Sequence, residues 1–284
     1  MPVLPNEVLQ WLQPQPGQTL VDGTFGGGHH AEALAEAVGS EGLVIGLDRD
    51  PQAIHDFDLR DLPMRLAVAN FCDLPEVLEA VDHGPVHGIL LDLGLSSDQL
   101  ADEERGFSFT SDGPLDLRFD TTSGKPASKL IERMSEGDLA DLIYQYGEER
   151  HSRKIARRIV AARRTRRLDN ARELADLICG AVPPSRDRNR IHPATRTFQA
   201  LRIAVNEELK SLEIALRRLA DCLVPDGRLA IISFHSLEDR QVKQAFRDDE
   251  RYSVLTKKPI RPNEAEVARN PRARSAKMRV ASRA

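Results

Sequence analysis

The chain has 284 residues, of which 40% are hydrophobic and 30% charged, and its formal net charge is −4. These values are ordinary for a globular protein that buries a real core in one large domain or two modest ones. No apolar run approaches the roughly 20 residues of a membrane-spanning helix, and the N-terminus lacks the segments of a secretory signal. We therefore expect a cytoplasmic protein with no membrane partner.

Strands and helices are predicted to alternate over the first hundred residues, as a parallel α/β sheet requires. Predicted strands cover 19–22, 43–48, 64–71 and 86–94. Predicted helices cover 31–38 and 75–81, and a further helix is predicted to begin at residue 51. This alternation predicts a Rossmann-like α/β fold.

The next segment, from about residue 100 to 192, contains no convincing strand. After a loop rich in Gly, Asp and Pro, helices are predicted at 135–146, 150–168 and 170–179, the first opened by a capping box from Ser135 to Asp138. We therefore expect an all-helical insertion at 101–206, for substrate or RNA recognition, within a sheet domain made of 1–100 and 207–284.

One long helix is predicted to return the chain to the sheet. Its apolar residues from Phe198 to Leu223 recur every three or four positions, and V-P-D-G at 224–227 is expected to end it before a strand at 228–234. The basic segment beyond Lys257 is predicted to be extended or ordered by a partner.

Positive charge is concentrated in two segments. Residues 150–167 hold eight Arg and Lys154 without an acid, and residues 251–284 hold 10 basic against 2 acidic residues. Two interpretations stay open: a solvated helix face with a disordered tail, or contact with a polyanion such as nucleic acid.

The three cysteines, Cys72, Cys179 and Cys222, are scattered and form no CxxC pair. This spacing favours neither a disulfide framework nor a zinc site, so we expect three buried, reduced thiols. No metal is expected at His29 and His30 either, because no third ligand follows at a suitable spacing.

The stretch V-D-G-T-F-G-G-G-H-H, residues 21–30, joins a predicted strand to a predicted helix. A glycine turn there, followed by an acid at the end of the next strand, is typical of dinucleotide or nucleoside binding, with Asp48 on the ribose hydroxyls. Asp22 would repel a pyrophosphate and attract an ammonium or sulfonium group. The residues alone thus favour S-adenosylmethionine over NAD.

Four further candidate residues lie at or just beyond the ends of predicted strands. Phe71 could lie against an adenine or belong to the core. Asp92 ends the apolar fourth strand, at the edge where α/β proteins bind ligands, and is the strongest candidate for ligand contact. His235 and Asp239, four residues apart at a strand-to-helix corner, either line a site or cap the helix.

Several long motifs resemble the bacterial RsmH (MraW) family. They include V-D-G-T-F-G-G-G-H-H, G-I-L-L-D-L-G-L-S-S-D-Q-L, D-G-P-L-D-L-R, H-P-A-T-R-T-F-Q-A-L-R-I-A-V-N-E-E-L and I-I-S-F-H-S-L-E-D-R-Q-V-K. The resemblance implies a class I S-adenosylmethionine-dependent methyltransferase fold. It further implies methylation of the N4 amine of a cytidine in the decoding region, the P site, of 16S rRNA within the 30S subunit, with no obligate protein partner.

The resemblance also implies contacts to the methyl donor from Gly28, His29, His30, Asp48, Phe71, Asp92 and Gln99. Asp22 and Gly26 of the same loop complete the predicted cofactor-binding set. His29 stands where the family more often has a glycine. Asp92 is also the candidate acceptor for a proton of the N4 amine.

RNA phosphates are expected to contact basic residues of the insertion and of the C-terminal segment: Arg150, Arg153, Lys154, Arg157, Arg158, Arg196, His235, Arg272, Arg274 and Lys277. A structural ion pair is an equally good interpretation of Arg196. Two rival functions stay open, an NAD-linked dehydrogenase and a non-enzymatic assembly factor that binds rRNA.

Overall fold

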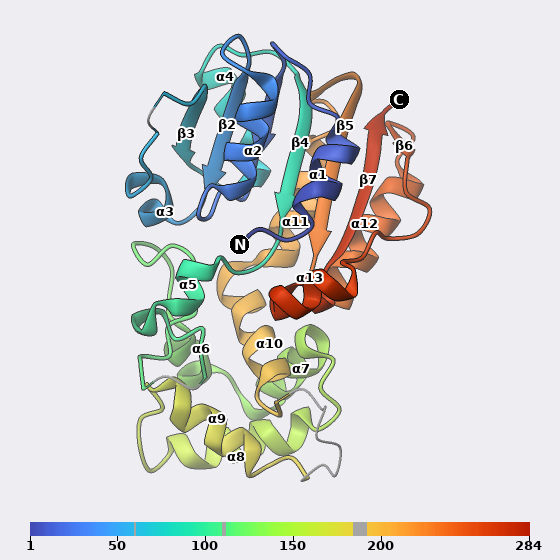
Figure 1. Cartoon of the computed structure of the whole chain (residues 1–284). Coiled ribbons are helices and arrows are strands. Elements are labelled where there is room, and N and C mark those ends of the chain that lie inside the picture. Colours follow the sequence, from blue (N-terminus) through green and yellow to red (C-terminus); the bar gives the residue numbers. More distant parts are fainter. Residues whose placement is uncertain (60, 110–111, 184–191) are drawn as a thin grey trace. The chain divides into compact units, whose positions relative to one another are not determined.

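The computed structural model describes residues 1–59, 61–109, 112–183 and 192–284. The chain divides into two compact units (Figure 1). Met1–Ser97 and Leu209–Ala284 form the first, which we call the sheet unit, and Asp98–Glu208 form the second, the helical unit.

The sheet unit contains a seven-stranded sheet in the order β3-β2-β1-β4-β5-β7-β6. Its strands are β1 (Thr19–Asp22), β2 (Leu43–Asp48), β3 (Met64–Val68), β4 (Val86–Asp92), β5 (Leu223–Ser233), β6 (Tyr252–Val254) and β7 (Lys277–Arg283). The pairs that β7 forms with β5 and β6 are antiparallel, and the other four pairs are parallel. This topology confirms the predicted Rossmann-like α/β fold.

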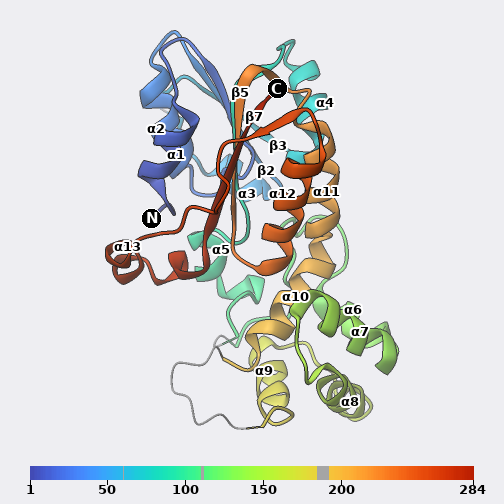
Figure 2. The same cartoon turned by 90° about the vertical axis from the view of Figure 1, so that its right-hand side faces the viewer.

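Helices cover both faces of this sheet (Figure 2). One face carries α1 (Pro5–Leu12) and α2 (His29–Val38), and the other carries α4 (Leu74–Ala80), α11 (Glu208–Arg218) and α12 (Ser236–Asp248). Successive residues of β4 alternate between two buried cores, because Leu90 packs on the α1/α2 face whereas Ile89 and Leu91 pack on the α4/α11/α12 face.

Shorter elements complete the sheet unit. Helix α3 (Pro51–His55) follows β2, and the 3-10 turn η1 (Phe71–Asp73) follows β3. Strand β3 ends earlier than predicted, at Val68, because Asn70 accepts a hydrogen bond from the Cys72 N–H (3.3 Å) and so caps η1. Phe71 therefore lies in a turn and not in a strand.

The prediction of one long helix after Phe198 is wrong. The chain forms α10 (Thr195–Asn206) and then α11, and Glu207 between them has a left-handed backbone with φ +49°. The apolar spacing continues across this break, so periodicity alone could not reveal it.

The V-P-D-G segment does not end a helix either. It lies inside β5, where the pairing with β4 skips from Val86–Leu223 to Gly88–Arg228. Asp226 within it has φ +61°, so the turn-like residues form an irregularity in the strand.

The prediction of an extended basic tail is also wrong. The segment forms α13 (Glu264–Arg269), the 3-10 turn η3 (Pro271–Ser275) and β7, which lies between β5 and β6 in the sheet. Met278 and Val280 are fully buried there. The alternation of polar and apolar residues at the start of K-M-R-V-A-S-R was the available strand signal.

The helical unit contains α5 (Ser97–Ala101), η2 (Glu103–Arg105), α6 (Ala127–Arg133), α7 (Glu136–Gly147), α8 (Ser152–Arg163), α9 (Ala171–Cys179) and α10. Its described residues form no strand, only an isolated β-bridge between Pro114 and Asn170. The predicted all-helical insertion is therefore confirmed. Ser135 caps α7 by accepting from the Asp138 N–H (3.1 Å), as the capping motif predicts.

No helix in the described ranges is long and apolar enough to cross a membrane. Cys72 and Cys222 are buried, as predicted, whereas Cys179 at the end of α9 is only partly buried.

Candidate functional site

The candidate site lies at the carboxyl ends of β1, β2 and β4, where the order of the strands reverses along the chain. Leu20 of β1 and Leu90 of β4 pack on the α1/α2 face. Since side chains on one face recur every second residue, Asp22 and Asp92 at the ends of these strands lie on the same face. They therefore share that face with the first turn of α2, which carries His30.

Thr24 connects the ends of β1 and β4. Its Oγ1 accepts a hydrogen bond from the Asp92 N–H (2.6 Å) and donates one to Asp22 Oδ1 (3.4 Å). Asp22 Oδ1 also accepts from the Thr24 N–H (3.1 Å). One hydroxyl thus holds both strand ends, a role that the sequence analysis missed and that only the D-G-T motif hinted at.

Three buried atoms here have no hydrogen-bond partner among the described residues: Asp22 Oδ2, His30 Nε2 and Asp92 Oδ1. His30 Nε2 lies 3.5 Å from Asp92 Oδ2, further than in a well-formed hydrogen bond. Buried polar atoms are costly when unpaired, so a ligand with matching groups is their simplest explanation. We call Asp22, His30 and Asp92 the acid–histidine cluster.

Burial raises the pKa of Asp22 to about 6, and the neighbouring His30 offsets only part of this. Burial lowers the pKa of His30, but the nearby carboxylate of Asp92 and the negative charge of Asp22 outweigh it, so the pKa is raised overall. The cluster can therefore hold a proton near neutral pH.

Asp48 at the end of β2 supports the glycine loop. Its Oδ2 accepts from the Gly26 N–H and its Oδ1 from the Asp50 N–H, each at 2.8 Å. Burial raises the pKa of Asp48. A carboxylate offers about four acceptor positions, so Asp48 could also accept hydrogen bonds from ribose hydroxyls.

Gly28 turns the chain into α2 with φ +76°. A Cβ at this position would lie 2.4 Å from Phe57 Cε2 and 2.8 Å from Phe25 Cζ, two rings that pack edge to face with centroids 4.8 Å apart. Both the backbone angle and the space therefore require glycine.

Replacing Gly28 by alanine is expected to destabilise the sheet unit by about 1–3 kcal/mol, because Phe25 or Phe57 must move and the backbone angle becomes strained. Denaturant unfolding measures this loss. The control is Gly84→Ala, at a glycine with no atom within 4 Å of the added Cβ, where we expect a change within about 0.5 kcal/mol. Equal losses in both variants would contradict the requirement for glycine.

The other residues predicted to contact the methyl donor have different surroundings. His29 is exposed at the start of α2. Phe71 packs partly against the core of the α4/α11/α12 face, and its Cβ is 3.1 Å from the position of a Cβ at Gly23. Gln99 is 7% exposed and belongs to the helical unit. The sheet unit brings six of the predicted residues to one edge: Asp22, Gly26, Gly28, His30, Asp48 and Asp92.

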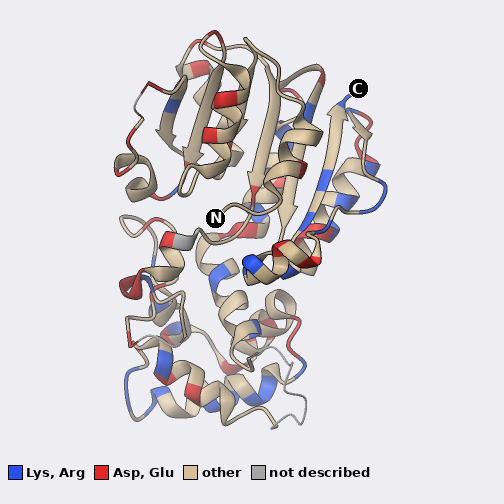
Figure 3. Ribbon diagram, in the orientation of Figure 1, with Lys and Arg blue, Asp and Glu red and all other residues tan. Residues whose placement is uncertain are grey.

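Basic residues recur along α8, where the ribbon of Figure 3 is blue in several places. Four of them have exposed side chains: Arg153, Lys154, Arg157 and Arg158. The opposite side carries the fully buried Ile155 and Ile159. Arg153 and Arg157 lie 3.5 Å and 3.6 Å from acids of α7, Asp141 and Glu136, in well-exposed pairs that contribute little to stability. Their charges thus stay available to solvent.

Two other predicted contacts of the helical unit, Arg150 and Arg196, are exposed as well. Arg196 Nη1 donates to the Glu148 carbonyl oxygen (3.1 Å), which anchors one end of its guanidinium to the backbone.

The predicted RNA contacts after β5 are engaged mostly within the sheet unit. His235 accepts from the Glu238 N–H (3.4 Å) and caps α12, the second of its two predicted roles. Lys277 Nζ lies 3.1 Å from Asp239 Oδ2, and Arg272 donates to the Leu95 carbonyl oxygen. Arg274 is exposed.

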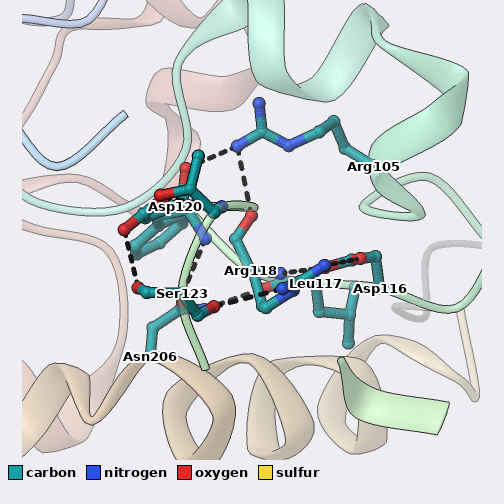
Figure 4. A network of polar contacts seen from close by, with 9 residues as sticks. Arg105, Asp116, Leu117, Arg118, Asp120, Ser123 and Asn206 are labelled. Atoms are coloured by element: carbon teal, nitrogen blue, oxygen red, sulfur yellow. Dashed lines mark hydrogen bonds and ion pairs between the residues drawn. The ribbon is translucent and has the colours of Figure 1, made fainter. Parts of the chain in front are cut away.

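A second polar cluster, which the sequence analysis also missed, organises a loop of the helical unit (Figure 4). The loop passes through Leu117, a buried non-glycine residue with φ +64°. Asn206 Nδ2 donates to the Leu117 carbonyl (2.7 Å), and Asn206 Oδ1 accepts from the Phe119 N–H (2.7 Å). Arg105 Nη2 donates to the carbonyls of Arg118 (3.1 Å) and Phe119 (2.6 Å).

Side chains of the same loop bond to one another. Arg118 makes a two-pronged pair with Asp116 (2.8 Å and 2.7 Å). Asp120 accepts from the hydroxyls of Thr122 and Ser123, each at 2.6 Å. The D-G-P-L-D-L-R motif that covers part of this loop was the only signal for it in the sequence.

The chemistry of the acid–histidine cluster fits a positively charged ligand. A phosphate would meet the carboxylates of Asp22, Asp48 and Asp92, whereas an ammonium or sulfonium group would be attracted and could satisfy the unpaired oxygens. S-Adenosylmethionine carries both cations and a ribose but no phosphate. The residues present therefore fit this methyl donor.

The protein-family model of the MraW methylase family matches residues 1–284. A protein of Rhodopirellula baltica named Ribosomal RNA small subunit methyltransferase H is 48% identical, over 99% of this chain and 90% of that protein. A protein of the same name from Synechococcus elongatus is 50% identical, over 99% of this chain and 93% of its own length. The solved structure of an rRNA methylase from Streptococcus thermophilus aligns over 98% of this chain and 93% of that one, with 11% identity and a TM-score of 0.44. The family match over the whole chain, with relatives near half identity, shows that the chain belongs to the MraW methylase family.

Proposed function

We propose that this protein transfers a methyl group from S-adenosylmethionine to the N4 amine of a cytidine in the decoding region of 16S rRNA, in the cytoplasm. Small-subunit rRNA methylation is the activity named in its relatives, and the cytidine follows from the family resemblance. The observation that carries the proposal is the acid–histidine cluster, with its unpaired atoms beside the glycine loop. Neither a dehydrogenase nor a non-enzymatic assembly factor finds support among these relatives.

The bound donor would supply a methyl group on a positively charged sulfur. Asp48 would hold the ribose while Gly26 and Gly28 admit the ligand close to the backbone, and Asp22 would attract its positive charge. Such a displacement depends mainly on positioning. Asp92 has a side chain that is 21% exposed and an unpaired Oδ1, so it could accept the proton that the N4 amine loses.

The exposed basic side of α8 is the proposed contact for RNA phosphates, with the 30S subunit as the substrate particle. Phosphates could replace the weak partners of Arg153 and Arg157, because the exposed pairs with Asp141 and Glu136 contribute little. Lys154 and Arg158 lie on the same side of the helix.

Replacing both Arg153 and Arg157 by alanine is expected to weaken rRNA binding and to reduce the slope of log K against log salt by about one per lost contact. Filter binding over a series of salt concentrations measures this. The control is Arg217→Ala, which removes an exposed arginine of α11 that pairs with Glu213. If the double variant has the same salt slope as the parent, α8 does not contact the RNA.

The proposed activity is tested by methyl transfer from labelled S-adenosylmethionine to 30S subunits whose rRNA lacks the modification, with naked 16S rRNA alongside. Nucleoside analysis should return the label as N4-methylcytidine, and the ratio of the two substrates tells which form is recognised. Label in another nucleoside would reject the acceptor but keep the methyltransferase. Absence of label with both substrates would reject the activity.

A further inference from the structure

The acid–histidine cluster holds more ionisable groups than donor binding alone requires. Asp22 from β1, His30 from α2 and Asp92 from β4 converge, and each leaves one buried polar atom without a partner. Asp22 is 1% exposed and His30 8% exposed, so water screens their mutual interaction poorly. The charge states of the buried Asp22 and His30 are therefore coupled to each other, beside the carboxylate of Asp92.

From this geometry we propose that the three residues share one proton, which leaves when the cationic methyl donor binds and is replaced by the proton of the acceptor amine. The inference rests on the proposed function and assigns His30 a positioning role. Through its charge state, His30 would make the site sensitive to the difference between a sulfonium donor and its product with uncharged sulfur.

The direction of the coupling follows from charge. With the proton present, the cluster carries one negative charge fewer and attracts a sulfonium less strongly than it does without the proton. The raised pKa values of Asp22 (about 6) and His30 put this proton near neutral pH. The other charged groups that act on the two residues are Asp48 at the end of β2 and the amino group of Met1. Donor affinity should therefore rise with pH.

The cluster loses and regains one proton in each turnover. When the amine nitrogen forms its bond to the methyl carbon, the S–C bond breaks, and its electron pair stays on sulfur and cancels the positive charge there. The amine then gives up one proton to Asp92, and the cluster, which lost its shared proton when the donor bound, again holds one. The same loss of sulfonium charge removes the reason for the cluster to stay deprotonated.

Isothermal titration calorimetry in buffers of different ionisation enthalpy counts the protons released on binding. We would titrate the full chain with S-adenosylmethionine and with S-adenosylhomocysteine between about pH 5.5 and 7, where both ligands carry a protonated amine. The first should release a substantial fraction of a proton and bind up to about tenfold tighter per pH unit. The second should release clearly less.

Two variants separate the role of His30 from that of any histidine. His30→Asn should reduce the proton count and narrow the difference in affinity between the two ligands. His83→Asn, at a residue that bonds to Gly84 and Thr19 near the amino ends of the strands, should leave both unchanged. If His30→Asn does not fold, the proton count of the parent protein still decides the question.

The outcomes separate the inference from the proposed function. Donor binding without proton release, or the same release in His30→Asn as in the parent, would overturn the shared proton and leave the methyltransferase intact. Failure of S-adenosylmethionine to bind at every pH would overturn both. The expected result is that S-adenosylmethionine binding releases protons, that S-adenosylhomocysteine binding releases clearly fewer, and that His30→Asn reduces the release seen with S-adenosylmethionine.

Discussion

Replacing Asp92 by asparagine is expected to lower the rate of methyl transfer by about 10²- to 10⁴-fold while the sheet unit stays folded. Asparagine keeps the shape of the side chain, and the Asp92 N–H still donates to Thr24 Oγ1. What disappears is the negative charge that faces His30, whose Nε2 lies 3.5 Å from Asp92 Oδ2, and with it the ability of a carboxylate oxygen to take up a proton. The acceptor for the N4 proton is lost with it.

Kinetics separate the two roles that Asp92 could have. Loss of proton acceptance lowers kcat at saturating donor, whereas loss of donor attraction raises the dissociation constant for S-adenosylmethionine. Single-turnover rates and calorimetric binding measure the two quantities. The control is Asp226→Asn, an exposed residue with φ +61° in the irregular start of β5, where asparagine is well tolerated. Parent-like rates in Asp92→Asn would remove the residue from the chemistry.

The predictable part of the fold was the part built from local patterns. The parallel strands could be located because each is a short apolar run between turn residues, and the strand that ends at Asp92 was located to within two residues. The break between α10 and α11 was not predictable, because the same apolar spacing runs through both helices. It depends on Asn206, whose side chain bonds to a loop almost ninety residues earlier in the chain.

The prediction for the basic C-terminal segment was wrong for a related reason. Composition marked residues 251–284 as basic, and the part beyond Lys257 was predicted to be extended or ordered by a partner, but β7 is an inner strand of the sheet. Its arginines and lysine are satisfied by tertiary partners, such as Asp239 beside Lys277 and Arg279. Charge counts along a sequence carry no information about such partners.

The candidate site was predictable as far as its residue types, since an acid at a strand end and a glycine turn have direct chemical meaning. Its internal geometry was not. The pairing of β1 with β4 brings Thr24 between Asp22 and Asp92. The packing of α2 against the sheet brings His30 to face Asp92. Sequence spacing does not specify these contacts.

Replacing Asn206 by leucine is expected to destabilise the helical unit by about 3–5 kcal/mol. Leucine has a similar size but leaves the Phe119 N–H and the Leu117 carbonyl without their partner in a place where Asn206 is only 2% exposed. Each buried group left unpaired costs about 1–3 kcal/mol. The left-handed backbone of Leu117 also loses a contact that holds it.

Denaturant unfolding gives the loss, and hydrogen exchange should show faster exchange at residues 116–123 before any change in the sheet unit. The control is Gln199→Leu, one turn or more earlier on α10, whose Nε2 makes one bond, to the Tyr146 carbonyl (3.0 Å). With one bond lost and no buried N–H abandoned, it should cost about 1 kcal/mol. An equal loss in both variants would mean that α10, and not the clamp of Asn206 on the loop, determines the stability of the unit. A larger loss in Asn206→Leu with faster loop exchange would mean that this asparagine keeps the D-G-P-L-D-L-R segment in its folded form.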